Sequence, residues 1–193
     1  MTLDFSQLFF SDFPGSLLQT LPFAAAAGAV FWFLKYRKDK TTPLSGKVWS
    51  VLFVCYSAEV ICMVFFLSSI RYFWGSLFLN NRPDNIIKVL FCRGTVNLIP
   101  DFYKNIDREN ILNMILFMPF GILYPLAKRD RSWIRTVLTG VICVIGAEGL
   151  QPMVGRSFDV NDIILNTAGV FISASLFFLI AWVIKRLKRI SSE

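Results

Sequence analysis

Polar and charged side chains recur at short, regular spacings inside an otherwise apolar part of this 193-residue chain. Carboxylates can hold or transfer protons, and with amides they can bind a cation or a polar head group. Burying a carboxylate at membrane depth costs about 2.5–3.5 kcal/mol, so such groups normally face a partner or a water-filled cavity. The candidate ligand-binding residues are Asn110, Asn113, Glu148, Gln151, Arg156, Asp159, Asp162 and Asn166.

The spacing of these residues predicts that they share helix faces. Asn110 and Asn113 are three residues apart, as are Glu148 and Gln151, and residues so spaced lie on one side of a helix. Another face carries five residues that follow one another at intervals of three or four: Asp159, Asp162, Asn166, Gly169 and Ser173. Small residues in that series allow a neighbouring helix to approach closely. The simplest packing turns the three faces together and encloses a small polar pocket.

Three interpretations of this set remain open. Acids and asparagines at helix N-termini could act only as caps, which leaves Glu148 and Asn166 unexplained. A ligand-binding pocket, the favoured interpretation, accommodates them all. Arg156 alone cannot neutralise three acids, so a protonated acid or a cationic ligand group would complete the balance. A hard-cation site for Mg²⁺ or Ca²⁺ would use the same three acids, although no loop motif supports it: Glu148, Asp159 and Asp162.

The elements that must position these residues are membrane-spanning helices. The chain is 55% hydrophobic and 17% charged, whereas a soluble domain has about 25% charged residues. Its apolar residues form blocks of bilayer-crossing length, which excludes a disordered chain and an ordinary soluble globule. The absence of histidine excludes a Ser-His-Asp triad and a His-ligated zinc site. The prediction is an all-α polytopic transmembrane bundle with spans near 17–34, 48–74, 110–127, 133–150 and 160–184.

The basic residues predict the orientation of this bundle. Thirteen of the twenty lie after the first, third and fifth spans. The positive-inside rule places those segments in the cytoplasm, the N-terminus outside and the chain in the cell membrane as a multi-pass protein. The net charge of +7 therefore reflects membrane orientation and predicts no nucleic-acid partner.

The chain divides into three predicted regions. Residues 1–47 hold an interfacial segment, the first span and a basic loop. Residues 48–184 form a four-span domain with a long outer loop at 75–109, in which 86–91 would lie on the membrane or fold back into it. Residues 185–193 form a basic tail that anchors against anionic lipid.

Glu59 is a separate candidate, because it lies deep inside the second predicted span. An acid in the membrane is a functional candidate by default. The alternative is a protonated carboxyl group that hydrogen-bonds to a serine, a tyrosine or a backbone carbonyl, and Tyr56 and Ser57 are close in sequence.

Three segments resemble the VanZ-like family of bacterial membrane proteins. They are Arg-Gly-Thr-Val-Asn-Leu-Ile-Pro at 93–100, the Asn-Ile-Leu-Asn to Pro-Phe-Gly stretch at 110–121, and the polar series at 148–169. The resemblance covers roughly 48–184 and adds Asn97 to the candidate site. Two departures are Asp101, where the family tends to have an aromatic residue, and Val170, where a second glycine is common. The family implies an envelope protein, and its named member is associated with teicoplanin resistance.

Three functions are compatible with this sequence. A non-enzymatic protein would bind a lipid head group, a lipid-linked cell-wall precursor or a lipoglycopeptide, with membrane lipids as further partners and no cofactor. An enzyme acting on such a lipid would use Glu148 and Asp162 as an acid and base pair. An accessory subunit or small transporter would use Glu59.

Overall fold

The computed structural model of the chain describes residues 8–9, 11, 13–78, 96–104, 108–129 and 132–191. Five helices in these residues are long and apolar enough to cross a membrane, which confirms the predicted helical spans. The orientation stays a prediction. Most of the N-terminal interfacial segment and the loop piece at 86–91 lie outside the described residues. The five helices are Phe13–Tyr36, Leu44–Phe78, Asn110–Lys128, Trp133–Val154 and Val160–Ile190.

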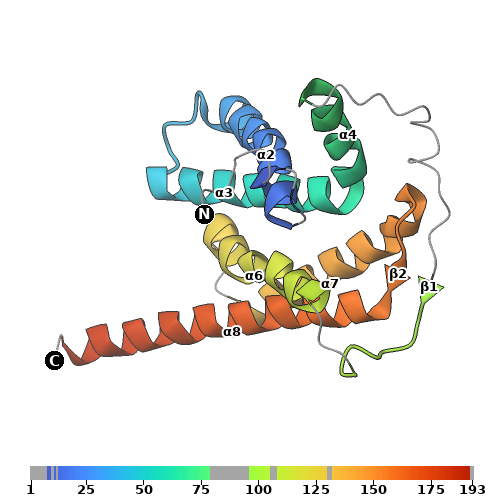
Figure 1. The fold of residues 1–193 in the computed structure, drawn as a ribbon. Coiled ribbons are helices and arrows are strands. Elements are labelled where there is room, and N and C mark those ends of the chain that lie inside the picture. The colour runs from blue at the N-terminus through green and yellow to red at the C-terminus, as the bar shows by residue number, and fades with distance from the viewer. Residues whose placement is uncertain are drawn as a thin grey trace, which may run out of the picture. The chain divides into compact units, whose positions relative to one another are not determined.

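The described elements are helices and one pair of two-residue strands (Figure 1). By contacts the chain forms two compact units. The N-terminal unit comprises residues up to 96 together with 150–158, and the C-terminal unit comprises 97–149 and 159–193. In chain order the elements are α2 (Phe13–Tyr36), α3 (Leu44–Ile61), η1 (Cys62–Phe66), α4 (Leu67–Phe78), β1 (Val96–Asn97), α6 (Arg108–Lys128), α7 (Trp133–Leu150), η2 (Gln151–Val154), β2 (Phe158–Asp159) and α8 (Val160–Ile190).

Close contact between α2 and α3 holds the N-terminal unit together. A Cβ atom added at Gly28 would lie 2.2 Å from the Cys55 sulfur, so the two helices meet where α2 has no side chain. Ala24, one turn earlier on α2, is 1% exposed. Small residues at these positions allow the backbones to approach.

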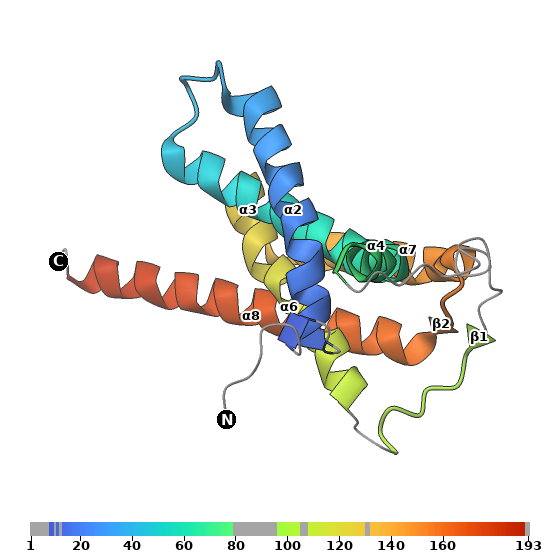
Figure 2. The same cartoon turned by 45° about the horizontal axis from the view of Figure 1, so that its top comes forward.

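The second predicted span is one helical stretch that bends at η1. Figures 1 and 2 show α4 leaving the direction of α3, and in Figure 2 α4 is seen nearly end-on. η1 is a π-helical turn, which is a known cause of sharp bends. The stretch that α3, η1 and α4 form together, Leu44–Phe78, is one of the five helices that are long and apolar enough to cross a membrane.

Three helices that alternate in direction make up the C-terminal unit. α6 and α8 approach each other closely at two glycines. A Cβ atom at Gly169 would lie 2.2 Å from the Met114 carbonyl oxygen, and one at Gly121 would lie 2.3 Å from Ser173 Oγ. The predicted close approach at Gly169 is therefore confirmed. α6 continues as a helix through Pro119.

Candidate functional site

The first turn of α8 is capped by a predicted site residue. Asp159 precedes the helix in an extended conformation, and its side chain accepts a hydrogen bond from the Asn161 backbone N–H at 2.8 Å. The same carboxylate accepts from Asn97 Nδ2 at 3.2 and 3.3 Å. Asp159 is thus a helix cap, as the capping interpretation held, and also the partner of an amide from β1.

A second pair lies beside the first. Asn161 Nδ2 donates to Asp101 Oδ1 at 2.9 Å, and Asn161 Oδ1 accepts from the backbone N–H groups of Asp101 and Phe102 at 2.9 and 3.2 Å. Sequence reasoning did not assign Asn161 to the site and treated Asp101 only as a departure from the family pattern. Their complementary groups are 60 residues apart, so spacing gave no signal for the pairing.

The two acids proposed for acid–base chemistry also accept from asparagine amides. Asn113 Nδ2 on α6 donates to Asp162 Oδ1 at 2.5 Å, and Asn166 Nδ2 donates to Glu148 Oε1 on α7 at 3.0 Å. Glu148 and Asn166 are each 2% exposed. The structure therefore joins α6, α7 and α8 through residues from each of the three predicted polar faces.

We refer to these residues as the acid–amide cluster. A hydrogen bond from an amide favours the ionised form of a carboxylate but supplies no positive charge. Asp159 and Asp162 lie at the N-terminus of α8, where the helix dipole adds favourable potential for acids. Glu148 lies in the last turn of α7, where the dipole gives no such support. The cluster comprises four pairs: Asn97–Asp159, Asn161–Asp101, Asn113–Asp162 and Asn166–Glu148.

One acceptor in the cluster is buried without a donor. Asn166 Oδ1 has no hydrogen-bond partner among the described residues, although its Nδ2 is bonded to Glu148. Turning the amide over would set two acceptor oxygens against each other if Glu148 is ionised. This oxygen therefore offers a place for an N–H or O–H donor.

Two predicted site residues belong to the N-terminal unit. Gln151 begins η2 and is 2% exposed. Arg156 donates through Nη1 to the carbonyl oxygens of Met63 and Val64 at 3.3 Å. Both carbonyls lie in the π-helical turn η1, whose wider hydrogen-bond spacing changes the partners of backbone carbonyls. Arg156 thus holds the bend between α3 and α4. Asn110 is the third residue of α6 and is half-buried.

Removing the Arg156 guanidinium should loosen this bend. We expect Arg156→Gln to lower the free energy of unfolding by about 1–2 kcal/mol, because two carbonyl oxygens lose a charged donor. Arg156→Lys should fall between Gln and wild type, since an ammonium group lacks the planar fork. Thermal unfolding in detergent measures the effect, with the loop variant Lys38→Gln as the matched control. Equal midpoints for Arg156→Gln and Lys38→Gln would contradict this role.

A second polar cluster, inside the N-terminal unit, surrounds Glu59. Thr20 Oγ1 on α2 lies 2.5 Å from Glu59 Oε1, and Trp74 on α4 donates to the Gln19 carbonyl oxygen at 2.9 Å. Arg71 Nη2 donates to Ser16 Oγ at 2.7 Å. The sequence-based alternative for Glu59 named nearby Tyr56 and Ser57 as possible partners, whereas the structure places a threonine from another helix there.

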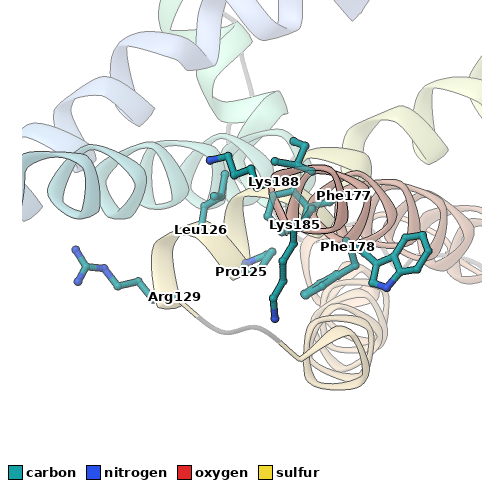
Figure 3. Close-up of a pocket in the computed structure, with 10 residues that line it drawn as sticks. Pro125, Leu126, Arg129, Phe177, Phe178, Lys185 and Lys188 are labelled. Carbon is teal, nitrogen blue, oxygen red and sulfur yellow. The ribbon is translucent and has the colours of Figure 1, made fainter. Parts of the chain in front are cut away.

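A basic groove lies between α6 and α8 toward their C-terminal ends, away from the acid–amide cluster. It has a volume of about 700 Å³ and is lined mainly by apolar side chains, including Phe177 and Phe178, with Lys185 and Lys188 among its cations (Figure 3). Arg129 extends outward in the same view. Apolar walls next to ammonium groups suit the acyl chain and phosphate of an anionic lipid.

Asp39, in the loop between α2 and α3, is held in its ionised form. Hydrogen bonds from the Thr42 and Thr41 side chains and backbone keep the pKa of the Asp39 carboxyl well below its usual range. The Thr41 N–H and Oγ1 each donate to Asp39 Oδ1 at 2.7 Å. Asp39 is therefore a reference for an ionised acid in this chain.

Among the described residues, no group of three or more acids or cysteines is placed to hold a metal ion.

The helices and their lengths define a multi-pass helical membrane protein. A family model described as VanZ/LLP1 matches residues 53–182, more than half of the chain. The chain therefore belongs to the VanZ/LLP1 family, as the motif resemblance implied. Neither a curated protein nor a solved structure was found that matches it significantly.

Proposed function

We propose that this VanZ-like protein binds an envelope ligand through the acid–amide cluster and so contributes to glycopeptide resistance. The ligand classes are a lipid head group, a lipid-linked cell-wall precursor and a lipoglycopeptide such as teicoplanin. The observation that carries the proposal is the set of four carboxylates, each bonded to an asparagine amide from another part of the chain. The proposal places the acid–amide cluster at the outer face of the cell membrane.

The donor and acceptor balance of the cluster favours a ligand with an amino group. A cluster of four carboxylates attracts positive charge, and an ammonium group on the ligand would supply it. The buried Asn166 Oδ1 supplies a further acceptor for such a donor. Because asparagine amides hold Glu148 and Asp162 in place, the arrangement supports binding more than proton transfer by these two acids. The basic groove, at the other end of the unit, is proposed to hold anionic membrane lipid.

Drug susceptibility tests the resistance role. A sensitive Gram-positive host would carry empty vector, the wild-type protein, Asp162→Asn or Asp39→Asn at matched membrane levels. We expect the wild type and Asp39→Asn to protect against teicoplanin, and Asp162→Asn to return susceptibility to the vector level. Both substitutions remove one negative charge, but Asp39 lies in a loop of the other unit. Protection that is equal in both variants would contradict a role for the cluster.

Native mass spectrometry tests binding directly. Purified protein would be offered amino-bearing and amine-acetylated forms of the same lipid-linked precursor. We expect retention of the amino-bearing form alone, reduced in Asp162→Asn because a carboxylate partner of the ammonium group is lost. Equal retention of both forms would show that the amino group is not recognised. Chemical change of the bound precursor would instead favour the enzyme hypothesis.

A further inference from the structure

The buried face of α2 carries three polar residues that no part of the proposed function uses. Ser16, Gln19 and Thr20 are 2%, 1% and 0% exposed. Residues three or four apart share one helix face, so the three side chains point the same way. Glu59 on α3 and Arg71 on α4 both hydrogen-bond to this face, at Thr20 and Ser16 respectively. All of these residues belong to the N-terminal unit.

The Thr20 hydroxyl group has more acceptors than it has protons. Its oxygen lies 2.8 Å from the Ser16 carbonyl oxygen, 3.2 Å from the Leu17 carbonyl oxygen and 2.5 Å from Glu59 Oε1. A hydroxyl group donates one hydrogen and accepts at its lone pairs. The carbonyl oxygens can only accept. If the Thr20 O–H donates to the Ser16 carbonyl oxygen, Thr20 has no further hydrogen for its contact with an ionised Glu59. A proton on Glu59 satisfies both contacts.

The second oxygen of Glu59 is consistent with a proton on the first. Glu59 Oε2 is buried and has no hydrogen-bond partner among the described residues. An ionised carboxylate would leave negative charge on that oxygen without a donor, which is costly in an apolar interior. A neutral carboxyl group leaves only a carbonyl-type oxygen there. Gln19 Oε1 on the same face of α2 is also a buried acceptor with no donor in the described part of the chain.

Charged and titratable groups near Glu59 come from its own helical stretch, from α4 and from the 150–158 segment. Its own stretch contributes the thiols Cys55 and Cys62, one turn before and after it. α4 contributes Arg71, which reaches α2 one turn from Thr20. The 150–158 segment contributes Arg156, which is bonded to carbonyl oxygens of η1. Arg71 is the cation that shares the polar face of α2 with Glu59.

We propose that Glu59 is a proton-binding site inside the membrane. The Glu59 carboxyl O–H donates to Thr20 Oγ1, and the Thr20 O–H donates to the Ser16 carbonyl oxygen. The site lies just before the π-helical turn, so proton binding acts at the joint between α3 and α4. This inference does not depend on the acid–amide cluster, which belongs to the other unit.

Infrared difference spectroscopy of the full chain in lipid nanodiscs tests the proposal at pH 7. The spectrum of wild type minus Glu59→Gln should contain the C=O stretch of one protonated carboxylic acid per chain, which shifts in D₂O. The spectrum of wild type minus Asp39→Asn should contain the bands of one carboxylate, because Asp39 is held ionised. A carboxylate signal in the Glu59 spectrum would overturn the proposal.

A second variant keeps the test decisive if Glu59→Gln does not insert. Thr20→Val preserves the side-chain volume and removes the hydroxyl group. If Glu59 donates to Thr20, the acid C=O band must shift in this variant, since the carboxyl O–H loses its acceptor. A carboxylic acid spectrum identical to that of the wild type would overturn the proposal equally. The drug-susceptibility assay separates this proposal from the proposed resistance function. If Glu59→Gln protects against teicoplanin as well as the wild type does, the resistance function does not depend on the Glu59 proton.

Discussion

Replacing Gly169 with alanine should destabilise the protein by about 3 kcal/mol, at the upper end of the cost of overpacking. The added Cβ atom would lie 2.2 Å from the Met114 carbonyl oxygen and 3.1 Å from its carbon. These atoms are backbone, so no side-chain rotation relieves the contact. α6 and α8 would have to separate, which would also pull apart the Asn113–Asp162 pair that joins them.

Gly149→Ala is the matched control, because it makes the same chemical change in a helix of the same unit. A Cβ atom at Gly149 meets nothing within 4 Å. Alanine should therefore be neutral there, or stabilise by up to about 1 kcal/mol through its helix propensity. Unfolding of purified protein in detergent by heat or denaturant measures both. Similar midpoints for Gly169→Ala and wild type would mean that the close approach of α6 and α8 is not required.

Asn166→Ala should cost about 2 kcal/mol, because it removes an amide donor from a buried carboxylate. Glu148 and Asn166 are both 2% exposed, and their 3.0 Å hydrogen bond joins α7 to α8. Water cannot easily replace the lost donor at that depth. The loss should therefore exceed that of an exposed asparagine by severalfold.

A double-mutant cycle separates the pair from the packing around it. The variants are Asn166→Ala, Glu148→Gln and the two combined, each measured by unfolding in detergent. If the hydrogen bond is the cause, the Asn166→Ala loss should shrink in the Glu148→Gln background, with a coupling energy of about 1 kcal/mol. Strictly additive losses would assign the effect to packing alone.

The helical spans could be predicted from sequence because blocks of apolar residues have to cross a bilayer as helices. The faces within the C-terminal unit could also be predicted, since intervals of three and four fix the rotation of a helix. The Gly169 contact and the joining of Asn113 to Asp162 follow from that periodicity. The role of the cluster in ligand binding stays a prediction.

Other contacts could not be predicted, because spacing within one helix does not determine what meets it from another. Thr20 and Glu59 are 39 residues apart, and hydropathy does not encode their pairing. The π-helical turn at Cys62–Phe66 contains neither glycine nor proline to mark it. Arg156 was grouped with the acids by proximity in sequence, yet its guanidinium donates to carbonyls of that turn.

The origin of Thr20 has a consequence for how such chains can be divided. Thr20 precedes the segment that matches the family model, whereas Glu59 lies within it. A fragment that begins after α2 would lack Thr20, the hydrogen-bond partner of the Glu59 carboxyl group. α2 therefore supplies a hydrogen-bond partner to a polar residue of the segment that matches the family model. Complementation by α2 supplied as a separate peptide would restore that core, and loss of α2 would require a compensating change at Glu59.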